Sequence, residues 1–170
     1  MVQDKTVLEL DIADQELLFA ASKARENAYA PYSKFAVGAA LRTVDNHIFV
    51  GTNMENAAYG VTMCAEVGAL TAATAAGKLS ADTIAIVGGP VDGRAGEVVT
   101  PCGRCRQLIF EAADLYGNDT RVLAANGDLS RVQLFTIQEL LPEAFGPSTL
   151  GVQVPRSGSG LFTRPTKKIG

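Results

Sequence analysis

The sequence predicts an α/β fold in which helices cover both faces of a mixed five-stranded sheet. Helical segments and short apolar segments rich in β-forming residues alternate in the order α-β-β-α-β-α-β-β-α. The chain has 170 residues and 47% of them are hydrophobic, which is enough for one buried core. No internal repeat is visible, so we expect a single domain over residues 1–150.

The first helix is expected over residues 14–29, because apolar residues recur there at helical spacing and Pro31 follows. The next two segments, FAVGAALRT and HIFVGTN, are rich in β-formers and are separated by the turn-prone VDN. They predict a hairpin. The strand over residues 36–41 is apolar on both faces, so we expect a central position for it.

A second helix is expected in CAEVGALTAATAAG, which is rich in alanine, lacks proline and ends on a glycine suited to a helix C-terminus. DTIAIVGG predicts a short buried strand, and the polar PVDGRAGEVVT predicts a loop. CGRCRQLIFEAADLYG opens after Pro101 and closes at Gly117, which predicts a third helix.

Two further strands, TRVLAAN and RVQLFT, flank a GDLS turn. TIQELLPEAFG predicts a short helix that Pro142 ends. From Val154 onward the chain is rich in Pro, Gly, Ser and basic residues, so residues 151–170 are expected to form a C-terminal extension or tail.

Composition narrows the function. A net charge of −3 and a pI near 5.2 provide no positive field for a phosphate backbone, which argues against nucleic acid as the main partner and favours a small ligand. The start of the chain lacks a signal-peptide pattern, and no run of about 18 apolar residues predicts a membrane span. Three cysteines are an odd number for a disulfide framework, and a chain of this length does not need one. We therefore expect a soluble cytoplasmic protein with reduced thiols and no membrane partner.

The three cysteines all fall at predicted helix starts. Cys64 begins the second helix, and Cys102 and Cys105 begin the third as a C-x-x-C pair. Free backbone N–H groups and the positive end of the helix dipole stabilise thiolates there. Three protein ligands leave the fourth position of zinc open, as in catalytic sites. Glu66 lies two residues after Cys64, where a carboxylate can act as a general base.

Three other interpretations of the cysteines remain open. A structural zinc needs a fourth ligand, for which His47 is the only histidine, although its place beside the hairpin turn favours a solvated residue. A redox C-x-x-C pair does not explain Cys64 and Glu66. The cysteines could also be small apolar core residues.

Four stretches, YAPYSKFAVGAAL, GTNMENAAYGVTMCAEVGAL, TPCGRCRQ and QELLPEAFGPSTL, resemble the successive signatures of the cytidine deaminase family over about residues 15–150. This resemblance implies the three-layer α-β-α fold of that family. It also implies zinc on Cys64, Cys102 and Cys105. Glu66 then takes a proton from the water on the metal, delivers it to N3 of the pyrimidine, and helps the amino group at C4 to leave as ammonia. A cysteine as first ligand resembles the branch that acts on free nucleosides.

The same resemblance implies a set of substrate contacts. Asn53 and Glu55 are expected to hydrogen-bond the ribose hydroxyls, and Phe35 to lie against the base. The backbone N–H of Ala65 and the carbonyl of Thr100 are expected to hold the base edge. The family's homotetrameric assembly implies that Tyr59 and Phe145 help to close the active site of a neighbouring subunit.

The chain departs from the family at the residue after Cys-Ala-Glu. Many members have an arginine there that can donate to the zinc-bound thiolates, whereas this chain has Val67. Three thiolates and one zinc ion sum to a charge of −1. We hypothesise that Arg104 or Arg106 donates to the sulfurs instead, the alternative being that both arginines point to solvent.

Alternative functions follow from single features. An apolar residue after Cys-Ala-Glu, together with PCGRCRQ, also occurs in the related blasticidin S deaminases, although NMEN and FGPSTL are closer to the cytidine enzymes. A non-catalytic zinc module would not need Glu66. A nucleic-acid-editing deaminase would need a basic surface, and the only basic cluster lies in the tail, at Arg156, Arg164, Lys167 and Lys168. Cytidine and deoxycytidine are therefore the expected substrates, and pyrimidine salvage the expected role.

Overall fold

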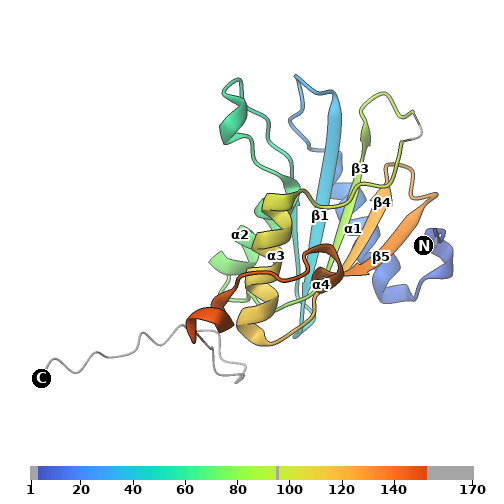
Figure 1. The fold of residues 1–170 in the computed structure, drawn as a ribbon. Coiled ribbons are helices and arrows are strands. Elements are labelled where there is room, and N and C mark those ends of the chain that lie inside the picture. Colours follow the sequence, from blue (N-terminus) through green and yellow to red (C-terminus); the bar gives the residue numbers. More distant parts are fainter. Residues whose placement is uncertain (1–3, 95, 153–170) are drawn as a thin grey trace, which may run out of the picture.

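The computed structural model describes residues 4–94 and 96–152, and the strands in these residues form one five-stranded sheet (Figure 1). Its order is β2-β1-β3-β4-β5. β1 runs antiparallel to both β2 and β3, β3 and β4 are parallel, and β4 and β5 are antiparallel. The predicted mixed sheet is confirmed. Its strands are β1 (Phe35–Thr43), β2 (Ile48–Thr52), β3 (Ala81–Pro90), β4 (Arg121–Asn126) and β5 (Val132–Thr136).

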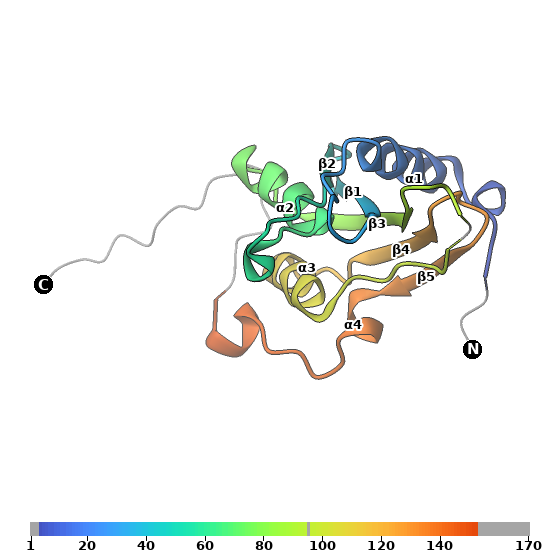
Figure 2. The same cartoon turned by 90° about the horizontal axis from the view of Figure 1, so that it is seen from above.

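Helices cover both faces of this sheet. The element order agrees with the predicted one, with three short 3-10 turns added. Figure 2 shows α1 on one face and α2 and α3 on the other, which gives the three layers. The helices are α1 (Ile12–Arg25), α2 (Ala65–Ala75), α3 (Gly103–Tyr116) and α4 (Ile137–Leu140), and the 3-10 turns are η1 (Val7–Glu9), η2 (Tyr59–Val61) and η3 (Pro147–Leu150).

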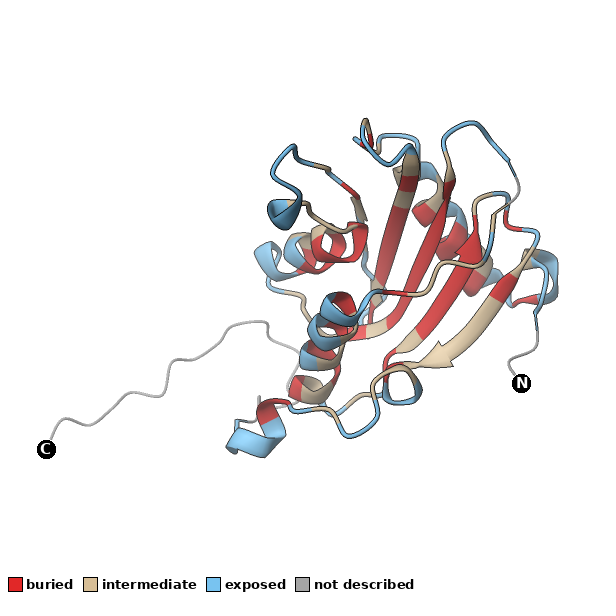
Figure 3. Ribbon diagram, turned by 45° about the horizontal axis from the view of Figure 1, so that its top comes forward, coloured by how far each residue is buried: buried red, intermediate tan, exposed pale blue. Residues whose placement is uncertain are grey.

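Each face of the sheet has its own hydrophobic core. Leu17 and Leu18 of α1 are fully buried, in a cluster that includes Val87 and Leu123 of the sheet. On the other face, Ile109 of α3 packs in a cluster with the alanine-rich face of α2 and with β1, β3 and β4. Burying one such aliphatic side chain contributes about 1.5–3 kcal/mol. The interior strands are accordingly buried over most of their length (Figure 3).

Two details of the first half differ from the predictions. The first helix ends at Arg25, so the predicted end at Tyr29 is wrong. Tyr29 instead pairs with the chain after β2, because its N–H donates to Asn53 O at 3.0 Å and its carbonyl accepts from Glu55 N at 2.8 Å. β1 is an interior strand, but β3 takes the centre of the sheet. A tertiary contact and the strand order, which local sequence does not encode, account for both differences.

Helices α2 and α3 begin at the same end of the molecule. α2 can lie close to β2 because Gly51 has no side chain: a Cβ there would meet Ala65 O at 2.3 Å. α3 ends at Gly117, whose left-handed φ of 66° provides the predicted glycine cap. No helix among the described residues could cross a membrane. Residues 153–170 of the predicted tail lie outside the described part of the chain.

Candidate metal centre and active site

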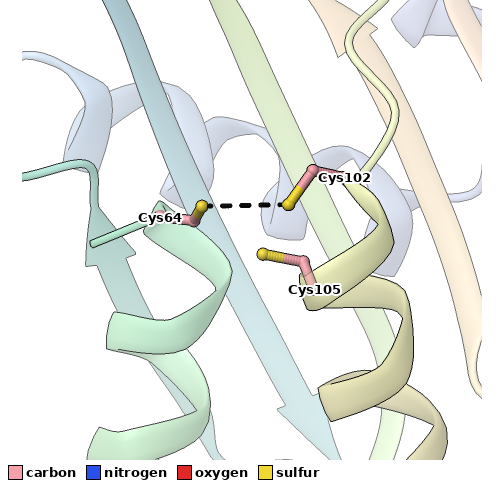
Figure 4. Close-up of side chains that lie close together, drawn as sticks. All are labelled: Cys64, Cys102 and Cys105. Carbon is pink, nitrogen blue, oxygen red and sulfur yellow. Dashed lines mark hydrogen bonds between the residues drawn. The ribbon is translucent and has the colours of Figure 1, made fainter. Parts of the chain in front are cut away.

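The three cysteines meet at the N-termini of α2 and α3. Cys64 is the N-cap of α2, Cys102 is the N-cap of α3, and Cys105 lies in the first turn of α3. Their sulfur atoms point toward one another (Figure 4), and all three lie within 4.8 Å of each other. Cys105 is buried, Cys64 is half-buried and Cys102 is exposed. The prediction that two distant stretches form one cluster is therefore confirmed.

The cluster has the dimensions and chemistry of a zinc site. Tetrahedral zinc with Zn–S distances of about 2.3 Å places its sulfurs about 3.8 Å apart. The Cys64 and Cys102 sulfurs are 4.0 Å apart. Within residues 4–94 and 96–152, the metal-binding group consists of these three cysteines alone. His47 lies at the hairpin turn with its side chain 53% exposed and its Nδ1 3.2 Å from Asp45. The fourth position of a bound zinc ion would therefore be left for water or substrate.

Two of the three thiols have pKa values shifted in opposite directions. A hydrogen bond from Cys105 lowers the pKa of Cys64 to about 6, although burial and nearby Glu66 oppose this shift. The pKa of Cys105 is raised, because its thiol donates to Cys64 and is buried beside negative charge. One sulfur is thus ready as a thiolate at neutral pH, while another keeps its proton until a cation takes its place.

Glu66 lies in the first turn of α2, and only 4% of its surface is exposed. Burial raises the pKa of its carboxyl, and hydrogen bonds from its own backbone amide and from Cys105 oppose the rise. This is a carboxyl group removed from bulk water and placed beside the sulfur cluster. A raised pKa makes the carboxylate a better proton acceptor, as a general acid–base residue requires.

Phe35 lies on the same side of the sheet as the cysteines. It is the first residue of β1, and strand alternation gives it the face of Val37, which packs in the α2/α3 core. A Cβ on Gly88 would meet Val99 Cγ2 at 2.8 Å and the Phe35 ring at 3.3 Å. The ring therefore lies over the glycine of β3 beside Val99. This glycine leaves room for the aromatic ring at the edge of the site.

Asn53 directly follows β2 and is 91% buried, because its relative exposure is 9%. Its side chain holds the backbone of β1: Val37 N donates to Oδ1 at 2.9 Å, and Nδ2 donates to Phe35 O at 3.0 Å. An amide has four hydrogen-bonding positions, so one N–H and one lone pair are left over. The residue expected at the ribose thus also fixes the backbone of Phe35.

Glu55 is half-buried in the loop after β2 and binds a different segment. Its Oε2 accepts from the backbone N–H of Tyr32 at 2.9 Å and of Ser33 at 3.2 Å. Hydrogen bonds from Ser33 and Tyr32 lower the pKa of this carboxyl. The group therefore stays ionised well into the acidic range, and its second oxygen takes part in no hydrogen bond among the described residues.

Two backbone groups were also predicted to hold the base. Ala65 is fully buried and is the first residue of α2, so its N–H has no acceptor within the helix. Thr100 lies two residues before Cys102, and its hydroxyl is 3.5 Å from an Arg106 nitrogen. Ala65 thus directly follows Cys64, and Thr100 is separated from Cys102 by Pro101 alone.

The two arginines of the third helix differ. Arg106 donates to Pro101 O at 2.8 Å and to Leu140 O at 3.0 Å, which ties the start of α3 to α4. Among the described residues, its hydrogen bonds go to these two carbonyls and to the Thr100 hydroxyl, and none goes to a cysteine sulfur. Arg104 is exposed, with its Nη2 3.9 Å from Met63 Sδ, and its charge contributes to the low pKa of Cys64.

Tyr59 and Phe145 are 73% and 61% exposed, respectively. Tyr59 contacts Tyr32, with ring centroids 5.8 Å apart. Phe145 is held through its backbone, because Gln107 Nε2 donates to its carbonyl at 2.8 Å. Two aromatic rings that a single subunit leaves in solvent are candidates for contacts with another subunit.

Arg25, at the C-terminal end of α1, was not predicted from the sequence. Its guanidinium donates to four backbone carbonyls around the site end of the sheet, of Ala36, Gly89, Pro90 and Gly127. Backbone acceptors carry no residue-type pattern. The only sequence signals were glycines at two of these positions.

Comparison with known proteins agrees with this geometry. Residues 12–115 match the family described as the cytidine and deoxycytidylate deaminase zinc-binding region. The cytidine deaminase of Halalkalibacterium halodurans is 44% identical over 133 residues, which cover 77% of this chain and 92% of that protein. The cytidine deaminase of Mycobacterium tuberculosis is 39% identical over 128 residues, covering 74% of this chain and 84% of that protein.

Solved structures give the same result. The crystal structure of cytidine deaminase from Burkholderia pseudomallei superposes with a TM-score of 0.68 at 42% identity, covering 76% of this chain and 97% of that chain. The structure of cytidine deaminase from Mycobacterium leprae gives a TM-score of 0.62 at 34% identity, covering 78% of this chain and all of that chain. The chain thus resembles cytidine deaminases both in sequence and in fold.

Proposed function

Because this chain belongs to the family of cytidine and deoxycytidylate deaminases, we propose that it catalyses the hydrolysis of cytidine and deoxycytidine to uridine and deoxyuridine plus ammonia. One observation carries the proposal. Three cysteine sulfurs from two helix N-termini lie within 4.8 Å of each other, beside a buried glutamate whose pKa is raised. That arrangement provides a metal position with an open site and a proton carrier next to it.

In this proposal Cys64, Cys102 and Cys105 hold zinc. When bound, zinc supplies a Lewis acid that makes a water molecule acidic enough to react at neutral pH. Glu66 accepts the proton of the attacking water and delivers it to N3 of the pyrimidine. It then carries the remaining proton of that water, now on the oxygen bonded to C4, to the amino group, which leaves C4 as ammonia. The reaction consumes one water and exchanges the C4–N bond for a C4–O bond, with no change in oxidation state.

The chain's other residues bind and orient the nucleoside. Phe35 lies against the base, and the free N–H of Ala65 and the carbonyl of Thr100 bind its edge. The unused amide valences of Asn53 and the free oxygen of Glu55 bind the ribose hydroxyls. The depressed pKa of Glu55 supports this role, because an ionised carboxylate is the stronger acceptor for a hydroxyl.

Arg104 offsets the negative charge of the three thiolates in place of the arginine that is missing at Val67. Its charge already lowers the pKa of Cys64, whereas the donors of Arg106 are directed at carbonyls. The offset acts through the electrostatic field, because the Arg104 contact in this structure is to the Met63 sulfur.

The proposal extends to assembly and location. Residues 1–150 form the catalytic domain, residues 151–170 form an extension, and four copies form a homotetramer. The exposure of Tyr59 and Phe145 supports the tetramer, since both rings are available for contact with a neighbouring subunit. Three unpaired thiols at a metal site suit the reducing cytoplasm, where salvage of pyrimidine nucleosides is the proposed role.

The direct test is the loss of absorbance from cytidine, deoxycytidine and blasticidin S in the presence of the purified zinc-loaded protein. Conversion of cytidine or deoxycytidine supports the proposal. Turnover of blasticidin S alone would contradict the proposed substrate, and no turnover of any of the three would contradict the proposed activity.

A further inference from the structure

Arg25 connects three segments of the chain that meet at the site end of the sheet. Its Nε donates to Ala36 O in β1 at 3.1 Å, and its Nη1 donates to Gly127 O after β4 at 3.2 Å. Its Nη2 donates to Gly89 O at 3.2 Å and to Pro90 O at 3.0 Å, at the end of β3. One side chain thus fixes the start of β1, the end of β3 and the β4–β5 turn relative to α1.

The surroundings of the guanidinium fit it closely. A Cβ on Gly127 would lie 3.0 Å from Nη2, 3.1 Å from Cζ and 3.2 Å from Nη1, and one on Gly89 would lie 3.3 Å from Nη2. Gly38 allows the backbone of α1 to approach, since a Cβ there would lie 2.5 Å from Arg25 N. Glycines at these three positions leave room for this arginine, and a larger residue at Gly127 would push its head group aside.

The acceptors are all carbonyl oxygens. Among the ion pairs of the described residues, none includes Arg25. Its position in the last turn of α1 places the positive charge at the negative end of the helix dipole. A guanidinium can satisfy several carbonyls in one plane, whereas a lysine ammonium is a single point with a different reach.

These segments carry the proposed base contacts. Ala36 directly follows Phe35, and in the sheet Phe35 pairs with Pro90 and Ala36 pairs with Gly89. Val91 N donates to Lys34 O at 2.9 Å. This bond joins the residue before Phe35 to the residue after Pro90. The connection that starts at Pro90 leads to Thr100. Arg25 belongs to α1, which covers one face of the sheet, whereas α2 and α3 cover the other (Figure 2). Strand alternation gives Phe35 the face of Val37, which packs in the core of the α2/α3 layer.

We infer that Arg25 is a positioning residue for substrate binding: it holds the backbone of Phe35 and of the Pro90 connection so that the aromatic ring and the Thr100 carbonyl meet the base. This inference rests on the proposed function, because it presumes that Phe35 lies against the pyrimidine. Arg25 itself touches neither the substrate nor the metal. Its loss therefore weakens binding while the cysteines and Glu66, held by α2 and α3, keep their places.

The test compares Arg25→Gln, Arg25→Lys and Gly127→Ala with the control Arg121→Gln. Arg121 is a matched control, because it too ties α1 to the sheet, through a bond to buried Asp14 at 3.1 Å, and its strand position pairs with Thr83 at the opposite end of β3. We expect the three test variants to raise the KM for cytidine about 3- to 10-fold, the range of an aromatic contact. They should keep their zinc and change kcat far less than KM. The control should keep the wild-type KM.

Hydrogen exchange provides a readout that does not need activity. Backbone amides in peptides covering residues 33–37 and 88–94 should exchange faster in Arg25→Gln and Gly127→Ala than in the wild type. In Arg121→Gln these amides should exchange at the wild-type rate. Unchanged KM and unchanged exchange in the Arg25 variants would overturn the inference, as would equal effects in the control. If the wild type does not deaminate cytidine, the proposed function fails, and the exchange comparison alone still decides whether Arg25 orders these segments.

Discussion

The Sγ atoms of Cys64 and Cys102 lie 4.0 Å apart, although 38 positions separate the two residues in the sequence. The fold achieves this because α2 and α3 begin at the same end of the molecule on one face of the sheet, each with a cysteine as its N-cap (Figure 4). The third sulfur, of Cys105, follows one turn later.

Zinc affinity should depend on pH through Cys105. The pKa of this thiol is raised, so at pH 7 it holds a proton that a metal ion must displace, whereas Cys64, with a pKa of about 6, is already ionised. Affinity should therefore rise with pH, about tenfold per unit for each proton released. Zinc titration calorimetry from pH 6 to pH 8, in buffers of different ionisation enthalpy, measures the zinc affinity and the number of protons released. Affinity that stays constant over this range would contradict the account.

Removal of one cysteine ligand should lower the zinc affinity more than removal of a residue that only contacts a ligand. Cys105→Ser replaces a buried thiolate ligand, and we expect zinc affinity to fall by more than about 100-fold, the upper range for outer-shell changes. Cys102→Ser should behave alike, although this cysteine is exposed. The measurement is competition with a chromogenic chelator, and the matched control is Thr71→Ser on α2. Full zinc retention by both cysteine variants would exclude the three-sulfur site.

Arg104 and Arg106 should have separable effects. Arg106→Gln removes charged hydrogen bonds to Pro101 O and Leu140 O, so we expect a loss of about 2–3 kcal/mol and a Tm lower by about 4–12 °C. Arg104→Gln changes an exposed side chain, so its Tm should stay near that of the wild type while zinc affinity falls by up to about tenfold. Calorimetry and zinc competition on both variants check this contrast. An Arg104→Gln protein with unchanged turnover and zinc affinity would show that Arg104 does not offset the charge of the thiolates.

Substitutions of Asn53 and Glu55 should differ in their effect on the stability of the fold, although both should weaken substrate binding. Asn53→Ala leaves the Val37 N–H and the Phe35 carbonyl without partners in a buried place, which costs about 1–3 kcal/mol and should raise KM as well. Glu55→Gln should raise KM with little change in Tm, because the glutamine side-chain oxygen can still accept from the N–H groups of Tyr32 and Ser33. Since the folded pKa of Glu55 is lowered, its contribution to KM should persist as the pH falls to about 5 and disappear only at more acidic pH. A KM that rises between pH 7 and pH 5 because of Glu55 would contradict this.

The tetramer proposal predicts that single subunits are poorly active. Tyr59→Ala and Phe145→Ala remove exposed rings, so each should leave the fold and zinc content unchanged while it lowers activity or shifts the protein toward smaller species. Gel filtration at several concentrations, with activity measured on each species, provides the check. A fully active monomer would refute the shared active site.

The sequence predicted the parts of the fold that local pattern controls. The strand segments, the glycine cap at Gly117 and the short helix before Pro142 all follow from periodicity and turn residues. The end of α1 did not follow, because Tyr29 leaves the helix to pair with the chain at Asn53 and Glu55. That pairing is a contact between distant segments, which a local pattern cannot show.

The site was predictable where chemistry restricts the residue type. Cysteines and a glutamate at helix starts have few roles, so the ligand cluster could be expected from spacing. Arg106 and Arg25 could not be assigned in this way, because both donate to backbone carbonyls that any residue can offer. For the same reason, the sequence did not predict that the Asn53 side chain holds the backbone of β1 in addition to the proposed ribose contact.

The central claim is that buried Glu66 moves protons in a cytidine deamination that the zinc site supports. The most direct measurement is the loss of absorbance from cytidine with wild type and Glu66→Gln, with zinc quantified in both proteins. The account predicts equal zinc and a rate at least about 10²- to 10⁴-fold lower in the variant, the range for a lost general acid–base group. Equal rates in the two zinc-loaded proteins would contradict it.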